Sequence, residues 1–239
     1  MKAFIYTIWL HIKLSVRSKE MLVHFYVVPL VFYLFIGGVF TSINPIAYQT
    51  LIQTMTIFAI SMGGILGSPY ANVEFYGSDI KRAYQVGNIP IWIVALGNFI
   101  STTINLIFVS MIILVSAPII FNAEIPSNIL SYSLSLMLSI FASVGIGTVF
   151  GLCFKSTAKM GMASQLVFLP SLMLSGIMFD NSLLPTALSS IGNIFPATWA
   201  FRAMTASEFD VMANVTLVIV MAIMLFVSAV RIKQLGKQE

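Results

Sequence analysis

The chain has very little charge. Asp, Glu, Lys and Arg make up 8% of its 239 residues, whereas 59% of the residues are hydrophobic. Soluble domains carry about 25% charged residues, so these few charges could not cover the surface of a soluble fold of this size. The composition therefore excludes a soluble globular protein and predicts an all-α polytopic membrane protein, most of whose surface faces lipid.

The chain also lacks the groups that most enzymes and ion-coupled carriers need. Its only histidines, His11 and His24, both lie in the first tenth of the sequence, and Cys153 is its single cysteine. No zinc site and no pair of nucleophile and base can be assembled from these residues, so we expect no catalytic residue, metal or cofactor on this chain. The sequence has no GxxxxGK[ST] phosphate loop. The long apolar runs have no ionisable residue near their middles that could bind a coupling ion. Energy for any work must therefore come from a partner.

Six apolar runs are long enough to cross a membrane, which takes about 20 residues. They are 21–40, 45–69, 89–121, 129–154, 160–179 and 211–230. The third run is too long for one straight span, and Pro118 near its end predicts that it tilts or breaks there. The segment between the fifth and sixth runs is interrupted by Pro185, Gly192 and Pro196. It predicts two short, re-entrant half-helices at the outer interface.

The basic residues predict the orientation of these spans. If both termini are cytoplasmic, eleven of the twelve Lys and Arg residues lie on the inner side, as the positive-inside rule requires. The inner ones are Lys2, Lys13, Arg17, Lys19, Lys81, Arg82, Lys155, Lys159, Arg231, Lys233 and Lys237. Only Arg202 falls outside this set. Because the positive charge gathers at membrane ends, we expect contact with anionic lipid and no nucleic-acid partner.

Residues 1–20 form a separate element. Ile5, Ile8 and Ile12 recur at helical spacing, with Trp9 beside them and basic residues on other sides. This pattern predicts an amphipathic helix that lies in the inner interface. The alternative is a disordered basic tail.

Small residues recur every fourth position in the fourth run. They are Ser131, Ser135, Ser139, Ser143, Gly147 and Gly151. Such a row allows another helix to approach closely, so we predict a packing seam centred on its last four members. A polar wall of a translocation path is the alternative.

Uncharged polar residues share a face of the third run. Asn98, Thr102 and Asn105 are four and three residues apart, and Gln53 and Gln165 lie in the second and fifth runs. Hydrogen bonding between helices explains them. The alternative is that they line a cavity for a polar part of the cargo.

The stretch FYGSDIKRAYQVGNIP, residues 75–90, interrupts the apolar sequence with charge. Ser78 is a good N-cap, and Asp79 favours the positive end of a helix. Ile80 and Tyr84 lie four residues apart and so share one face as an apolar and aromatic pair. We predict a short helix over 78–86 that meets a partner; the alternative is a solvated loop.

The order of these elements resembles the membrane subunit of ABC-2 type ABC transporters. Two segments carry the likeness further: VEFYGSDIKRAYQVGNIPIW (73–92), similar to the family's inner loop, and SLMLSGIMFDNSLLPTALSSIGNIFPATWAFRA (171–203), similar to its stretch after the fifth span. The likeness covers essentially the whole chain. The family often has arginines flanking the acid that corresponds to Glu74, where this chain has Val73, Phe75 and Tyr76.

The resemblance implies one transmembrane domain over 1–239. Its parts are the interfacial helix 1–20, two spans in 21–70, a cytoplasmic coupling loop 71–88, two spans in 89–154, and the fifth span, re-entrant segment and sixth span in 160–230. The coupling residues it implies are Glu74, Ser78, Asp79, Ile80, Lys81, Arg82 and Tyr84.

The resemblance also implies a half-transporter in the bacterial cytoplasmic membrane. Two such chains, identical or paired with a sister chain, would sit on two copies of a separate ATP-binding subunit. That subunit would bind ATP and Mg and hydrolyse the ATP, so this chain is not expected to be an enzyme. We expect export of an amphipathic or hydrophobic cargo, such as a peptide toxin, an antimicrobial peptide or a drug. The alternatives are a lipid or glycan exporter subunit, or an ion-coupled carrier or channel with no ATPase.

Overall fold

The structure, a computed structural model, describes residues 13, 19–43, 48–78, 80, 84, 86–87, 90–179 and 184–237. Within these residues the regular structure is entirely helical, which confirms the all-α part of the predicted fold class. The helices are α2 (Lys19–Leu22), η1 (Val23–Val27), α3 (Val28–Ile43), α4 (Leu51–Ser61), η3 (Met62–Gly67), α5 (Pro69–Gly77), α7 (Trp92–Phe121), α8 (Ile129–Cys153), α9 (Thr157–Leu174), α10 (Thr186–Gly192), α11 (Pro196–Thr205) and α12 (Val211–Lys237). The predicted interfacial helix over 1–20 lies almost wholly outside the described residues.

Four helices of the described chain are long and apolar enough to cross a membrane. They are Leu51–Gly77, Trp92–Phe121, Ile129–Cys153 and Val211–Gly236. The first predicted span corresponds to a shorter apolar helix, Val23–Val39. The fifth falls in α9, whose 18 residues include Lys159 and Gln165. The described residues therefore contain four candidate membrane-spanning helices, and the count of six stays a prediction.

The second span is longer than its sequence predicts. The expected span ended at Pro69, with a loop from residue 71, but the helix continues through Pro69 to Gly77. A proline removes a backbone donor and normally ends or kinks a helix. Here it follows the π-helical turn η3, and the hydroxyl of Ser68 donates to the carbonyl of Gly64 at 2.7 Å. The Ser68 hydroxyl thus supplies the hydrogen bond to the Gly64 carbonyl that Pro69, which has no backbone N–H, cannot donate. The helix continues, and Glu74 therefore lies on α5 rather than in a loop.

The third span does not break at Pro118. α7 runs for 30 residues with Pro118 inside it and ends at Phe121; its C-cap, Asn122, has a left-handed φ of 52° that turns the chain. A 30-residue helix is about 45 Å long, against about 30 Å for the hydrocarbon core. Because the proline lies in the last turn, little of the helix beyond it depends on the missing bond, and the extra length is taken up without a break.

The helix formed by α4, η3 and α5 is the centre of the bundle. It contacts α3, α7, α8, α9 and α11, and 94% of its apolar window is buried, against 11% for α12. α12 packs mainly on α8 and α11, and most of its other exposed side chains up to Val230 are apolar. The central helix is therefore shielded by protein, whereas α12 faces the surroundings, which in a membrane are lipid.

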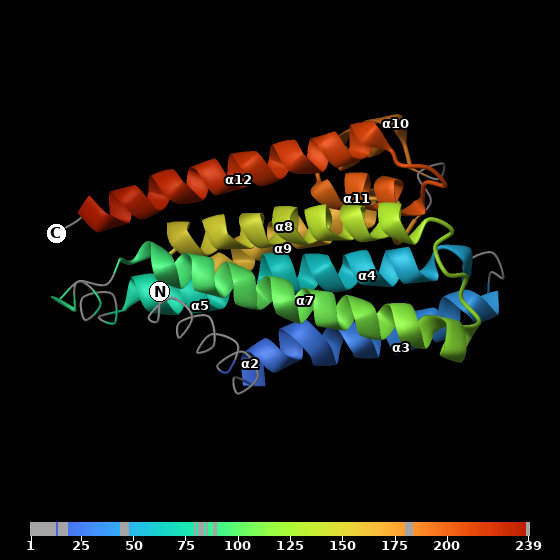
Figure 1. Cartoon of the computed structure of the whole chain (residues 1–239), viewed down its shortest axis with the longest axis horizontal. Helices are drawn as coiled ribbons and strands as arrows, with labels where there is room; N and C mark the ends of the chain where they lie inside the picture. Colours follow the sequence, from blue (N-terminus) through green and yellow to red (C-terminus); the bar gives the residue numbers. More distant parts are fainter. Residues whose placement is uncertain are drawn as a thin grey trace.

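Consecutive long helices run in opposite directions and divide the bundle into two ends (Figure 1). We call one the proximal end: it holds the end of α5, the start of α7, the junction of α8 with α9, and the end of α12 (left in Figure 1). We call the other the distal end, which holds residues 122–128 with α10 and α11 (right in Figure 1). Two short helices are thus present where half-helices were predicted, although their re-entry into a membrane is not shown.

Candidate functional site

The predicted coupling segment lies at the proximal end. The hydroxyl of Ser78 accepts a hydrogen bond from the amide of Ile80 at 3.3 Å, the contact that an N-cap makes with the second residue of a helix. Ile80, Tyr84 and Val86 have helical backbone, and Glu74 and Ser78 are exposed. Asp79, Lys81 and Arg82, which were also predicted to take part, lie outside the described residues.

Ile80 and Tyr84 do not form a single exposed pair. Ile80 is 52% exposed and Val86 is 90% exposed. The ring of Tyr84 instead packs edge-on against Phe75 of α5, with 4.9 Å between ring centroids and an interplanar angle of 84°. Phe75 itself is buried. Ile80 and Val86 therefore present apolar side chains that a partner can reach, whereas Tyr84 packs the segment against the central helix.

A hydrogen bond closes the base of this segment. The hydroxyl of Tyr76, on the last turn of α5, donates to the carbonyl of Ile91, the N-cap of α7, at 2.7 Å. Next to it, a Cβ added to Gly77 would lie 3.2 Å from the carbonyl oxygen of Lys155, so the end of α5 also contacts the junction of α8 and α9. The end of α5, from which the segment starts, is thus held against α7 and the α8–α9 junction.

The row of small residues on α8 lies against the central helix. A Cβ on Gly147 would overlap the carbonyl oxygen of Gly64 and the hydroxyl of Ser68. A Cβ on Gly64 would lie 2.7 Å from the Cβ of Ser143. A Cβ on Gly151 would lie 2.6 Å from the Cβ of Asn72. Ser139, one turn before Ser143, is buried and donates to the carbonyl of Ser135 at 2.6 Å. The two helices therefore approach closely, and none of Gly64, Gly147 and Gly151 has room for a side chain.

The asparagines predicted on α7 form hydrogen bonds to neighbouring elements. The Asn98 amide donates to the carbonyl of Ser68 at 2.8 Å. The Asn105 side-chain oxygen accepts from the hydroxyl of Tyr26, on η1, at 2.6 Å. Both asparagines are buried. These contacts agree with hydrogen bonding between helices, the first of the two roles expected for these residues. A role in transport stays a prediction.

The other predicted cavity residues differ in burial. Thr102 is buried on the same helix, and Gln53 is buried on α4 with no hydrogen-bond partner for its Oε1. Gln165 is exposed on α9. That these five residues line a cavity stays a prediction.

The part of the chain that the structure describes contains no group of three or more His, Cys, Asp and Glu residues that could hold a metal ion. A family model for the ABC-2 type transporter matches residues 2–209. The chain belongs to the ABC-2 type transporter family. A search of curated proteins and a search of solved structures found no match.

Membership in the ABC-2 family makes the chain a permease component of an ABC transporter, associated with an ABC ATP-binding subunit. Family members of this kind are transport subunits of the membrane and are not catalytic themselves. The match takes in the coupling segment, the seam on α8, and α10 and α11. It ends one residue before Asp210, so α12 lies outside it.

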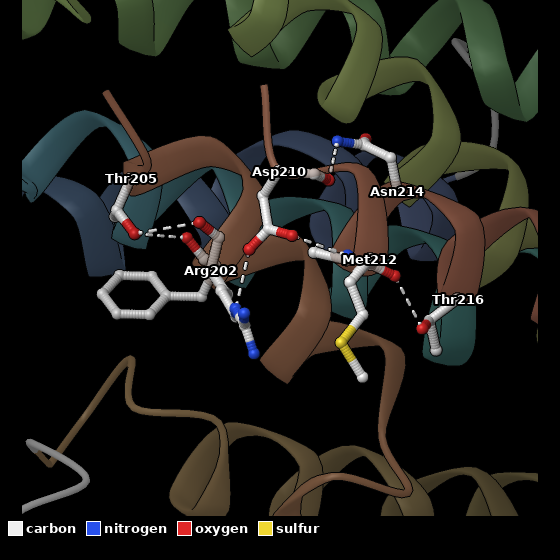
Figure 2. Close-up of polar contacts among 8 residues, drawn as sticks. Arg202, Thr205, Asp210, Met212, Asn214 and Thr216 are labelled. Atoms are coloured by element: carbon white, nitrogen blue, oxygen red, sulfur yellow. Dashed lines mark hydrogen bonds and ion pairs between the residues drawn. The ribbon is translucent and has the colours of Figure 1, made fainter. Parts of the chain in front are cut away.

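A polar clamp at the distal end joins α11 to α12 in this ABC-2 chain (Figure 2). The Nε of Arg202 donates to Oδ2 of Asp210 at 2.7 Å, and Oδ1 of Asp210 accepts from the amide of Ala213 at 3.0 Å. The guanidinium of Arg202 also lies 5.8 Å from the centre of the Trp199 ring. The Ala213 amide and then the Arg202 guanidinium hold the pKa of Asp210 below its usual value. Asp210 therefore caps α12 as a carboxylate.

The clamp extends to α8. The Asn214 amide donates to the backbone carbonyl of Asp210 at 2.8 Å, and the hydroxyl of Ser135 donates to the Asn214 side-chain oxygen at 2.9 Å. Arg202, the one basic residue that the positive-inside pattern did not place on the inner side, is thus paired with Asp210. The sequence signal for Asp210 was its place directly before the sixth apolar run, where N-caps occur.

One buried polar residue had no sequence signal. Asn72 on α5 is fully buried beside Gly151, and neither its Nδ2 nor its Oδ1 has a hydrogen-bond partner. An unpaired buried amide costs about 1–3 kcal/mol. Nothing in its neighbourhood along the chain distinguishes Asn72 from an ordinary polar residue near a membrane end.

Replacing Asp210 with asparagine should lower stability modestly. The variant keeps an oxygen for the Ala213 amide but loses the charge, so we expect a loss of about 1 kcal/mol at pH 7. Because the pKa of Asp210 is lowered by folding, the wild-type contribution is present above the ordinary carboxyl pKa of about 4 and is lost as pH falls through the folded value. Thermal unfolding in detergent should therefore separate wild type from variant at pH 7 and not at strongly acidic pH.

The exposed Glu208 offers a control for this clamp, because Glu208→Gln removes a neighbouring charge of the same sign. It should leave the melting temperature unchanged at both pH values. An Asp210→Asn variant that melts like wild type at pH 7 would show that the clamp does not stabilise the distal end.

Proposed function

We propose that this chain is the permease subunit of an ATP-driven exporter in the bacterial cytoplasmic membrane. In this proposal two such chains, identical or paired with a sister chain, stand on two copies of the ATP-binding subunit, which binds ATP and Mg. Each chain crosses the membrane six times, with α3 and α9 as the first and fifth spans. The α10 and α11 helices re-enter at the outer face. The cargo is amphipathic or hydrophobic, such as a peptide toxin, an antimicrobial peptide or a drug, so that export would confer resistance.

The observation that carries this proposal is the pairing of charge and exposed apolar surface at the proximal end. The basic side chains of the α8–α9 junction and of the end of α12 lie there: Lys155, Lys159, Arg231 and Lys233. By the positive-inside rule this end faces the cytoplasm, where ATP is. Ile80 and Val86 are exposed at the same end, on a segment with a packed base. An exposed apolar surface in the cytoplasm favours a protein partner.

The proposed mechanism is mechanical. Nucleotide-driven closure of the ATP-binding subunits pushes on the coupling segment and, through α5 and α7, tilts the spans. A cavity between the two permease chains then changes from inward-open to outward-open. The spans offer no ionisable residue near their middles, which supports an apolar or amphipathic cargo over a small ion.

Two other functions are compatible with the fold. A lipid or glycan exporter would share the ATP-binding partner, and only the cargo would differ. An ion-coupled carrier or channel would need no ATPase. Flux through proteoliposomes that contain this chain alone, without ATP, would favour the carrier over the exporter.

The native cysteine tests the orientation. Cys153 is exposed at the last residue of α8, at the proximal end. We expect a membrane-impermeant maleimide to leave Cys153 unlabelled in intact spheroplasts and to label it in inside-out vesicles, because the proximal end is proposed to be cytoplasmic. Labelling can be read by the mass shift of the purified chain.

The matched control moves the thiol to the distal end. In a Cys153→Ser background, Ile125→Cys places a thiol at an exposed position between α7 and α8. This variant should show the reverse pattern, with labelling in intact spheroplasts. If Cys153 reacts from outside and residue 125 does not, the proposed orientation is inverted and the coupling segment cannot meet a cytoplasmic ATPase.

A further inference from the structure

The last turn of α5 and the first turn of α7 flank the coupling segment, and two side-chain hydrogen bonds join these helices. The first is the bond from the Tyr76 hydroxyl to the Ile91 carbonyl at 2.7 Å. The second is the bond from the Asn98 amide to the Ser68 carbonyl at 2.8 Å. The two bonds are about two helical turns apart, or roughly 10 Å along the helices. Two such bonds fix both the separation and the relative rotation of α5 and α7.

An aromatic contact links the coupling segment to this helix pair. Tyr84 of the segment packs on Phe75, and Phe75 packs edge-on against Tyr76 with 4.9 Å between centroids. A displacement of the segment therefore reaches Phe75 and Tyr76 first. The Tyr76 hydroxyl bonds the N-cap residue of α7, so this chain of contacts runs from the segment through α5 to α7. The bond from Asn98 to Ser68 lies about two turns deeper.

The π-helical turn η3, which precedes α5, is tightly packed. In η3, Gly63 and Gly67 lie against the ring of Phe25, and the amide of Ser68 bonds the carbonyl of Gly63, five residues back, at 2.8 Å. π-helical turns inside longer helices occur frequently at functional sites. α5 therefore extends from the tightly packed turn η3 to the Tyr76 hydrogen bond at its proximal end.

We propose that Tyr76 is a positioning residue for transport, whose hydroxyl makes α5 and α7 move together when the ATP-binding subunit displaces the coupling segment. This inference rests on the proposed function. In this role Tyr76 acts within the chain, between α5 and α7, rather than through contact with the partner or the cargo. Its removal should therefore leave partner binding and ATP hydrolysis in place and weaken the helix movements that they drive inside the membrane.

The variant Tyr76→Phe removes only the hydroxyl and keeps the ring that packs on Phe75. Tyr33→Phe is the matched control. Tyr33 is buried, whereas Tyr76 is partly buried. The hydroxyl of Tyr33 forms a hydrogen bond with the hydroxyl of Ser116 at 2.9 Å, which joins α3 to α7 near the distal end. Both variants lose one interhelical hydrogen bond of a tyrosine, but only Tyr76→Phe loses it at the base of the coupling segment.

The first measurement needs no partner. Hydrogen exchange of the isolated chain in nanodiscs reports the opening of the first turn of α7. We expect the amides of residues 92–97 to exchange about fivefold faster in Tyr76→Phe, the effect of losing one partly buried hydrogen bond. Exchange there should be unchanged in Tyr33→Phe. Equal exchange in wild type and Tyr76→Phe would show that the bond does not hold the start of α7 and would overturn the inference.

The second measurement uses the complex with the ATP-binding subunit. A spin label at position 125, in the Cys153→Ser background, reports the distance between the distal ends of two permease chains. We expect ATP with vanadate to shift this distance in wild type and in Tyr33→Phe, and the shift to fall by more than half in Tyr76→Phe while partner binding and the ATPase rate stay unchanged.

Each other outcome has a distinct meaning. A full shift in Tyr76→Phe, or loss of the partner from that variant, overturns the positioning role. A wild-type chain that binds no ATP-binding subunit overturns the proposed function itself, whatever Tyr76 does.

Discussion

Replacing Gly147 with leucine is expected to destabilise the helix bundle strongly. A side-chain carbon at this position would occupy the space of the Gly64 carbonyl oxygen and the Ser68 hydroxyl. The first of these is backbone and cannot rotate away, and the hydroxyl is held by its bond to the same carbonyl. Overpacking of a close contact typically costs 1–3 kcal/mol; with backbone in the way we expect about 3 kcal/mol or more. Size-exclusion chromatography after heating should show aggregated protein and a lower melting temperature.

Gly147→Ala should lower the melting temperature by a smaller amount, because its single side-chain carbon already overlaps the Gly64 carbonyl oxygen. Gly161→Ala is the matched control: a Cβ there would have only the Tyr70 hydroxyl nearby, at 3.8 Å. Since alanine favours helix over glycine by about 1 kcal/mol, Gly161→Ala should melt at or above the wild-type temperature. A Gly147→Leu chain that elutes and melts like wild type would contradict the close approach of α8 and η3.

Replacing Ile80 with aspartate is expected to release the ATP-binding subunit without unfolding the chain. Ile80 is half-exposed in the free chain, so a carboxylate there is tolerated in water. Inside an interface the same carboxylate would be buried without a partner. Loss of an interface anchor costs about 2 kcal/mol, or roughly 30-fold in affinity. Co-purification of the ATP-binding subunit in detergent measures the change.

Two variants separate docking from folding. Ile125→Asp places the same charge at an exposed isoleucine of the distal end and should leave co-purification unchanged. Tyr84→Asp should lower stability as well as binding, because Tyr84 packs on Phe75. Unchanged co-purification with Ile80→Asp would show that this face of the segment does not dock.

The sequence predicted the helices well and their ends less well. Long apolar runs are a strong signal, since each spanning helix must satisfy its own backbone. The end of the second span was missed because Pro69 normally stops a helix. The π-helical turn η3 and the hydroxyl of Ser68 override that tendency. The turn packs against Phe25, which lies far away in the sequence, so no local pattern could have predicted it.

In the candidate site, too, the sequence predicted local features and missed contacts between distant residues. Ser78 could be chosen as a helix cap because capping chemistry is local. The direction of Tyr84 could not, because it depends on Phe75, which lies on α5 only if the helix continues past Pro69. Spacing placed Gly147 in a row of small residues, but the atoms facing it belong to η3 and the residue after it. The Tyr76 bond to Ile91 joins residues fifteen positions apart and has no sequence signature.

The most direct test of the central claim is the composition of the complex that the chain forms in its own membrane. The tagged chain is purified from its native cells in mild detergent, and the mass of the intact assembly is measured by native mass spectrometry. We predict two permease chains with two copies of a Walker-motif ATP-binding subunit, and loss of that subunit when the purified chain carries Ile80→Asp. An intact assembly without an ATP-binding subunit would contradict the proposed function.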